Sequence, residues 1–134
     1  MVIRYSFLWT REARAGSTEG RKDRPCAIVV AAPPDRNGNI RVVVVPLSHL
    51  LPADPATAIT LPPSVKAVLG LDDAPSWICL DELNVFAWPG YDLRPVPGTG
   101  RYDYGILPEN LFQQVRSGIL ALRQANRTRQ LVRD

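Results

Sequence analysis

The sequence contains few of the residues that build disulfide frameworks and metal centres. Two cysteines and one histidine occur among 134 residues. Cys26 and Cys79 each stand within an apolar run that is typical of a strand, so we expect buried free thiols in a reducing cytoplasm rather than a disulfide. With one histidine besides, the ligand count argues against a structural zinc site. We expect neither a metal ion nor a cofactor.

Long apolar runs are missing as well. The longest covers residues 40–47 and is interrupted by Arg41, whereas a helix that crosses a bilayer needs about 20 apolar residues. The residues that follow Met1 lack the charged-then-apolar order of a signal peptide. We therefore expect a cytoplasmic protein with no membrane partner. Its apolar content of 46% and charged content of 22% are ordinary for a globular domain.

Lysine is scarce, whereas arginine is abundant: the chain has 14 Arg and 2 Lys. Arginine binds phosphate through two parallel hydrogen bonds, but a GC-rich coding sequence raises the arginine content equally well. The net charge of +3 conceals a segregation, because residues 1–50 carry +4, residues 51–110 carry −5 and residues 111–134 carry +4. This pattern is compatible with a nucleic-acid partner but is too weak to identify one.

Short apolar, β-branched runs separated by turn signals predict a mainly β fold. Asn37-Gly38 stands between two such runs, so we expect the flanking strands to form an antiparallel hairpin. Asp81 and Glu82 mark either a bulge or a break in the last run. The predicted strands cover residues 3–9, 26–32, 40–47, 58–61 and 76–88.

Two helices complete the prediction. A short internal helix is expected over residues 64–69, and Pro108 suits the first position of a C-terminal helix. Residues 124–134 are expected to form a basic tail that frays. The whole chain, 1–134, is then a single domain: a small, mostly antiparallel β-barrel with a short internal helix and a C-terminal helix. The apolar stripe of the C-terminal helix consists of Leu111, Val115, Ile119 and Leu122.

One pair of side chains suggests chemistry. The turn at Asn37-Gly38 places Arg24 and Ser48 at the same far end of the hairpin, where they can converge. A guanidinium neutralises two phosphate oxygens while a hydroxyl hydrogen-bonds a third, which suits the attack of an RNA 2′-hydroxyl on its neighbouring phosphate. In the alternative, Arg24 pairs with Asp23 and Ser48 satisfies a turn backbone. Residue chemistry alone favours this alternative.

Further candidates surround this pair. The polar stretch of residues 10–23 is long for a loop without apolar periodicity, and such loops are usually functional. Within it, Glu19 or Asp23 acts as a base or positions Arg24. His49 follows Ser48 and acts as a proton donor or is a solvated loop residue. The candidates for RNA contact are Arg14, Arg21, Lys22 and Trp77, and Trp77 is either a stacking platform for a base or part of the core.

Several of these features occur together in the PemK/MazF family of toxin–antitoxin ribonucleases, which this chain resembles. The resemblance rests on Phe7-Leu-Trp9, on the loop Gly16-Ser-Thr-Glu-Gly20 and on the two strands that follow. Their sequences are Asp23-Arg-Pro-Cys26-Ala-Ile-Val-Val30 and Val43-Val-Val-Pro-Leu-Ser48. Residues 76–83 look like the family's later core strand. The pairing of Arg-Pro with Pro-Leu-Ser is the most specific part.

The resemblance implies an SH3-like barrel that forms a homodimer. Members of the family cleave single-stranded RNA, such as mRNA, without a metal and leave a cyclic phosphate and a 5′-hydroxyl. A cognate antitoxin protein blocks their site. By position, the family's functional arginine matches Arg24, its Thr or Ser at the strand end matches Ser48, and its acidic loop residue matches Glu19.

Two other functions stay open at this point. The same fold includes gyrase-poisoning toxins, which bind a protein and cut nothing, so the chain is alternatively a non-catalytic binding module. It is also compatible with a divergent family member that has lost its activity. The Arg24 and Ser48 pair favours the ribonuclease, because a protein that binds gyrase has no need of it.

Overall fold

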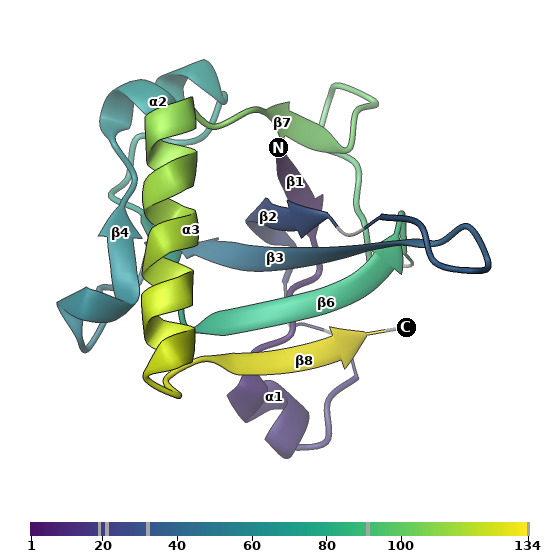
Figure 1. Ribbon diagram of the computed structural model, residues 1–134. Coiled ribbons are helices and arrows are strands. Elements are labelled where there is room, and N and C mark those ends of the chain that lie inside the picture. The colour runs from purple at the N-terminus through teal and green to yellow at the C-terminus, as the bar shows by residue number, and fades with distance from the viewer. Residues whose placement is uncertain (19, 21, 32, 91, 134) are drawn as a thin grey trace.

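A curled, mostly antiparallel sheet forms the body of the protein (Figure 1). The structure, a computed structural model, describes residues 1–18, 20, 22–31, 33–90 and 92–133. Its strands are β1 (Val2–Tyr5), β2 (Arg24–Ala31), β3 (Ile40–Ser48), β4 (Ala58–Thr60), β5 (Trp77–Cys79), β6 (Glu82–Trp88), β7 (Asp103–Gly105) and β8 (Arg129–Arg133). Its helices are α1 (Thr10–Arg14), α2 (Pro63–Val68) and α3 (Glu109–Gln124), with a 3₁₀ turn at Pro55–Thr57. The mainly β architecture is confirmed.

Strand β3 is the centre of the sheet. It forms the predicted hairpin with β2 and pairs along its other edge with β6. Pro46 is its last partner for β2, opposite Cys26, and the next two residues pair with β5 instead. Proline has no N–H to donate, so it stands where the ladder changes partner. Ser48 therefore lies at the point where the sheet turns from one set of strands to the next.

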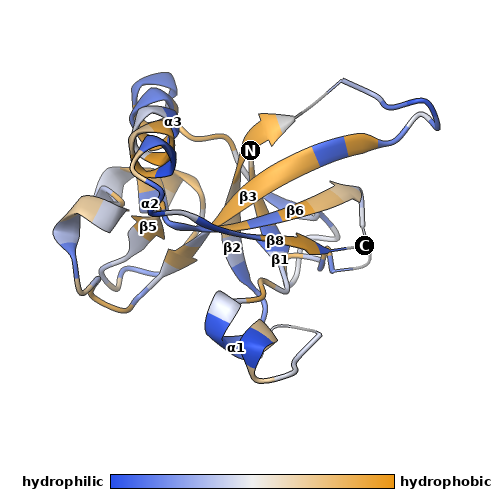
Figure 2. Ribbon diagram, turned by 60° about the horizontal axis from the view of Figure 1, so that its bottom comes forward, coloured by the Kyte–Doolittle hydropathy of each residue, from blue (hydrophilic) through white to orange (hydrophobic). Residues whose placement is uncertain are grey.

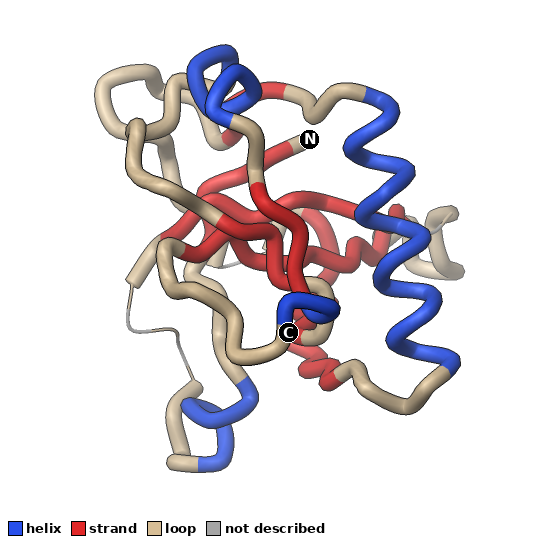
Figure 3. Tube along the Cα trace, turned by 90° about the vertical axis from the view of Figure 1, so that its left-hand side faces the viewer, coloured by secondary structure: helices blue, strands red, loops and turns tan. Residues whose placement is uncertain are grey.

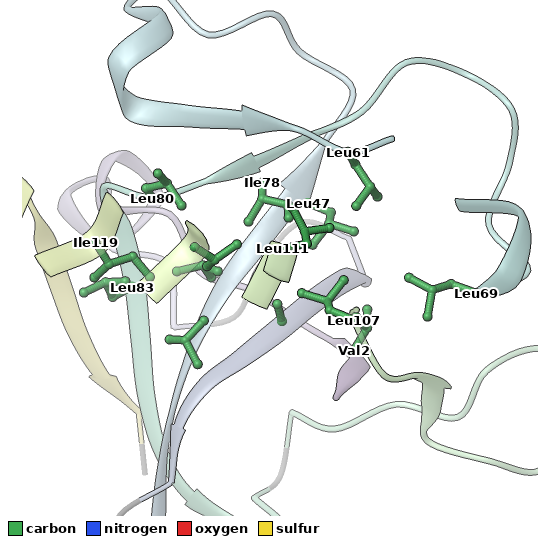
Figure 4. Packing of buried hydrophobic residues seen from close by; sticks show 14 of the residues in the cluster. Val2, Leu47, Leu61, Leu69, Ile78, Leu80, Leu83, Leu107, Leu111 and Ile119 are labelled. Carbon is green, nitrogen blue, oxygen red and sulfur yellow. The ribbon is translucent and has the colours of Figure 1, made fainter. Parts of the chain in front are cut away.

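Both faces of the central strands are buried. Because side chains alternate along a strand, Val2 and Ala27 enter one core while their neighbours Ile3 and Cys26 enter the other. The larger core lies between the sheet and α3 (Figures 3 and 4). The predicted stripe of α3 is buried there, as expected, at Leu111, Val115, Ile119 and Leu122. Figure 2 shows the hydrophobic colour along β3 and β6.

The C-terminal segment corrects the prediction of a frayed tail over residues 124–134. Residues 129–133 form β8, a strand that runs parallel to β6. Arg133 is buried, and its guanidinium donates to the backbone oxygens of Ser6 and Thr18 and forms an ion pair with Asp92 at 3.1 Å. A pattern rich in arginine predicts a solvated end, but here the guanidinium of Arg133 is buried and satisfied by partners within the protein.

The first strand and the loop after it also differ from expectation. β1 ends at Tyr5 rather than at Trp9, and the predicted loop of residues 10–23 begins with α1. The run predicted over residues 76–88 is two strands, β5 and β6, and the break at residues 80–81 agrees with the second of the two alternatives offered for Asp81 and Glu82. α3 begins at Glu109, so Pro108 is its N-cap rather than its first residue.

The thiols behave as predicted. Cys26 is buried, Cys79 is half-buried, and both are free. Burial raises the pKa of the Cys79 thiol to about 11, which keeps it protonated and unreactive. Within the described part of the chain, no helix is long and apolar enough to span a membrane.

Candidate functional site

A groove of about 440 Å³ opens beside the end of the β2–β3 hairpin. Three stretches of chain line it: Trp9 with the first half of α1, residues 22–25, and residues 47–50. The structure thereby brings together five residues that the sequence singled out, namely Lys22, Asp23, Arg24, Ser48 and His49. The convergence follows from the antiparallel pairing, since β2 begins where β3 ends.

Arg24 is the half-buried cation of the groove. Its guanidinium carbon lies 5.1 Å from the centroid of the Trp9 ring, and its Nε is buried without a hydrogen-bond partner among the described residues. Burial lowers the pKa of this guanidinium, but arginine remains protonated at any physiological pH. A buried donor that lacks a partner is costly, but Nε is too enclosed for a ligand to reach, so an anion in the groove would bind the outer nitrogens of the guanidinium.

The expected pairing of Arg24 with Asp23 is wrong. The Asp23 carboxylate lies 3.7 Å from the guanidinium of Arg4 and 3.7 Å from that of Arg94. Among the described residues, no carboxylate forms an ion pair with Arg24. The charge of Arg24 is therefore not cancelled by its neighbour in sequence.

Trp9 is a site residue that sequence reasoning missed. Its ring carries a second guanidinium, that of Arg11, at 4.9 Å from the ring centroid. One buried indole thus supports two arginines at one groove. The spacing of Trp9 and Arg11 was visible in the sequence, but residue 9 was expected to end a strand rather than to precede a helix.

Strand β6 fixes the position of Trp9 from both sides. The side chain of Asn84, which is fully buried, accepts from the Leu8 N–H and donates to the Leu8 carbonyl, both at 2.9 Å. On the other side, the Thr10 hydroxyl donates to Glu82 at 2.7 Å. The backbone N–H of Trp9 donates to the Glu12 carboxylate at 3.0 Å, and this hydrogen bond caps the start of α1. The indole of Trp9 is therefore positioned by hydrogen bonds to the neighbouring backbone rather than by a hydrogen bond of its own Nε1.

Ser48 is buried, and its Oγ accepts the Leu50 N–H at 3.1 Å. This is the turn-satisfying role that the sequence offered as an alternative. It does not use up the hydroxyl, because a serine that accepts one hydrogen bond can still donate its own. Ser48 can therefore close the turn and donate to a ligand in the groove.

His49 is half exposed and points a ring nitrogen at a carboxylate. Its Nε2 lies 3.1 Å from Oδ1 and 3.0 Å from Oδ2 of Asp72. A smaller cavity of about 60 Å³ adjoins the groove at Ser48 and His49, and Lys66 and Asp72 line it from the other side. His49 thus lines both the groove and the smaller cavity.

Two other predicted residues lie elsewhere, and two are not described by the structure. Trp77 is half-buried on β5 as the register partner of Ser48, but it does not line the groove. Arg14 is exposed at the end of α1 and outside the groove. Glu19 and Arg21 lie outside the described residues.

The groove is cationic in effect. Arg11, Lys22 and Arg24 line it together with Glu12 and Asp23, and both of these carboxylates already accept from groups of the protein. An anion with several oxygens suits such a site, because guanidinium and hydroxyl donors converge on it.

Comparison of the chain with protein-family models, with curated proteins and with solved structures finds no significant match.

Proposed function

We propose that this protein is the toxin component of a toxin–antitoxin system and cleaves single-stranded RNA without a metal ion. The observation that carries the proposal is Arg24, a half-buried cation without an ion-pair partner among the described residues. It shares one groove with the Ser48 hydroxyl and with His49. The resemblance of the sequence to the PemK/MazF family agrees with this arrangement and extends it to an SH3-like barrel of that type and a homodimer.

The proposed reaction is an internal transfer at phosphorus. The 2′-oxygen of a ribose forms a bond to the adjacent phosphorus while the bond to the departing 5′-oxygen breaks, which leaves a cyclic phosphate and a 5′-hydroxyl. Arg24 neutralises the charge that gathers on the non-bridging oxygens, and Ser48 donates a hydrogen bond to them. The proton of the 2′-hydroxyl passes to a base, for which the sequence offers Glu19. His49 supplies the proton that the 5′-oxygen takes up.

The decisive experiment is RNA cleavage in a chelator by the wild type and by Arg24→Ala. Removing one donor that stabilises transition-state charge costs about 10²–10³ in rate, and we expect a loss of that order. The matched control is Arg36→Ala, because Arg36 is exposed and stands in the turn between β2 and β3. Products must carry cyclic phosphate ends. Intact RNA under expression that stops growth would overturn the proposal.

A second candidate is a protein-binding module of the same fold. Leu50 and Leu51 beside the groove are 71% and 77% exposed, and exposed leucines of this kind occur at protein interfaces. Under the first proposal, these leucines belong to the surface that an antitoxin covers. Growth arrest that depends on Leu50 and Leu51 but not on Arg24 would favour the second candidate.

A further inference from the structure

His49, the single histidine of the sequence, is connected through Asp72 to the buried Lys66. Both oxygens of Asp72 lie within 3.1 Å of His49 Nε2. The same carboxylate accepts from Lys66 Nζ at 2.8 Å and from the Ala74 N–H at 3.1 Å. Lys66 is 4% exposed, and it also donates to Ser76 Oγ at 2.7 Å and to the Ala74 carbonyl. All three donors of its ammonium group are used.

The local backbone explains how Asp72 reaches both partners. Helix α2 ends in a left-handed residue, Gly70, with φ of +68°. The N–H groups of Gly70 and Leu71 then donate to the carbonyls of Ala67 and Lys66, a pattern that closes a helix and reverses the chain. The reversal brings residue 72 back beside the side chain of residue 66. The helix-closing turn thus places Asp72 beside Lys66, although its side chain stays exposed.

The protonation of Asp72 decides which nitrogen of His49 is protonated. The hydrogen bonds from Lys66 and His49 lower the pKa of the Asp72 carboxyl to about 2, so this group is a carboxylate that only accepts. Nε2 must then carry a hydrogen, and in the neutral ring Nδ1 must be the bare nitrogen. No described residue hydrogen-bonds to Nδ1.

We propose that Asp72 and Lys66 are positioning residues that hold His49 as the Nε2–H tautomer, and that Nδ1 is the atom that exchanges a proton with the substrate. The catalytic half of this inference rests on the proposed function. In the protonated ring, the Nε2–H group stays hydrogen-bonded to Asp72, and the proton on Nδ1 passes to the departing 5′-oxygen. The unit joins the groove to the small cavity that Lys66 lines.

The test of the tautomer uses the full chain without RNA. Since His49 is the only histidine, ¹⁵N-histidine labelling gives one pair of ring signals. At a pH where the ring is neutral, Nδ1 should resonate at the position of a fully unprotonated ring nitrogen. In Asp72→Ala, the Nδ1 signal should move part of the way toward the protonated position, because a free imidazole exchanges between tautomers. The matched control is Asp73→Ala, at the exposed neighbouring aspartate, which should leave both signals in place.

The wild-type spectrum alone can overturn the inference, whether or not the variant folds: a hydrogen on Nδ1 in the neutral ring contradicts it. Cleavage assays test the catalytic half. Asp72→Ala should lower kcat about tenfold or more with little change in KM, and Asp73→Ala should not. A kcat unchanged in Asp72→Ala would reduce Asp72 to a structural role and overturn the inference. A fixed tautomer in a protein that cuts no RNA supports the His49–Asp72 unit and overturns the ribonuclease proposal alone.

Discussion

Arg24 illustrates how a folded chain keeps a cation available for a ligand. Its guanidinium lies over the face of Trp9, and the neighbouring carboxylate, Asp23, is turned toward Arg4 and Arg94. Contact with an aromatic face stabilises arginine by about 0.5–2 kcal/mol but leaves its charge uncancelled. The guanidinium is thereby held at the groove that it lines, where an anion can pair with it.

A first prediction separates the charge of Arg24 from the shape of its guanidinium group. Arg24→Lys keeps the positive charge but loses the planar group that stacks on Trp9 and presents two parallel donors. We expect cleavage to remain at least about tenfold below the wild type, as it does when a preorganised donor is lost. Cleavage rates measured beside Arg36→Lys check this. Near-normal rates in Arg24→Lys would mean that charge alone suffices.

A second prediction concerns Asp72 and acid. Its pKa in the folded protein is about 2, below the value of about 3.9 expected in the unfolded chain. The stabilisation is therefore complete above about pH 4 and is lost as the pH falls toward 2. Since the side chain is 55% exposed, we expect less than about 1 kcal/mol from it. The free energy of unfolding in urea should fall less steeply with acid in Asp72→Asn than in the wild type. Parallel curves for the two proteins would contradict the assignment.

At the scale of elements, β8 links the end of the chain to the wall of the groove. It pairs with β6, and its last residue, Arg133, binds the backbone at Ser6 and Thr18 on either side of α1. The strand therefore braces the segment that carries Trp9. Figure 1 shows β8 between β6 and α1.

A third prediction follows for Arg133. Arg133→Gln leaves Asp92 without its ion pair and removes the donors to the buried Ser6 carbonyl and to the Thr18 carbonyl, and breaking a buried pair typically costs about 3–5 kcal/mol. Arg129→Gln is the matched control, because Arg129 lies on the same strand but is 61% exposed at 4.0 Å from Glu82. Urea unfolding should separate the two variants by about 2 kcal/mol or more. Equal, small losses would show that the Arg133 contacts contribute little.

The elements also show what a sequence can predict. The β2–β3 hairpin depends on Asn37-Gly38 between two apolar runs, and α3 depends on an apolar stripe that repeats over about three turns. Both signals are local, and both predictions are confirmed. α1 has five residues, too few for a periodic signal. β8 pairs in parallel with a distant strand, and its alternation is hidden among arginines.

The candidate site is likewise predictable from the sequence only where its residues follow from a local signal. Arg24 and Ser48 converge because the hairpin register brings the ends of β2 and β3 together. The role of Trp9 depends on contacts across the groove, and the Asp72 contact depends on a turn 23 residues after His49. Neither has a local signature. The ion pairs of Asp23 with Arg4 and Arg94 likewise replaced the pairing that adjacency suggested.

At the scale of the whole molecule, the modest net charge of +3 conceals a local concentration of cations. Arg11, Lys22 and Arg24 meet at one groove, although the chain carries an acidic middle segment. A strand of nucleic acid would therefore bind through a small number of phosphates rather than through the protein's overall field.

A fourth prediction measures that number. For a single strand, the logarithm of the association constant falls with the logarithm of the salt concentration by about 0.7 per phosphate contact. Binding of a 2′-deoxy oligonucleotide, which cannot react, should show a slope that shrinks by about 0.7 in Arg11→Gln. Arg101→Gln, at a residue paired with Asp103 outside the groove, should leave the slope unchanged. Binding that is insensitive to salt would instead indicate an apolar protein partner.

The buried end of β8 has a consequence for the order of synthesis. The groove takes its wall from residues near the N-terminus, yet Arg133 braces that wall from the far end of the chain. A nascent polypeptide on the ribosome can therefore make these bracing contacts only after residues 129–133 have left the exit tunnel. A fusion that holds β8 inside the tunnel should leave the Arg133 contacts with Ser6 and Thr18 unmade.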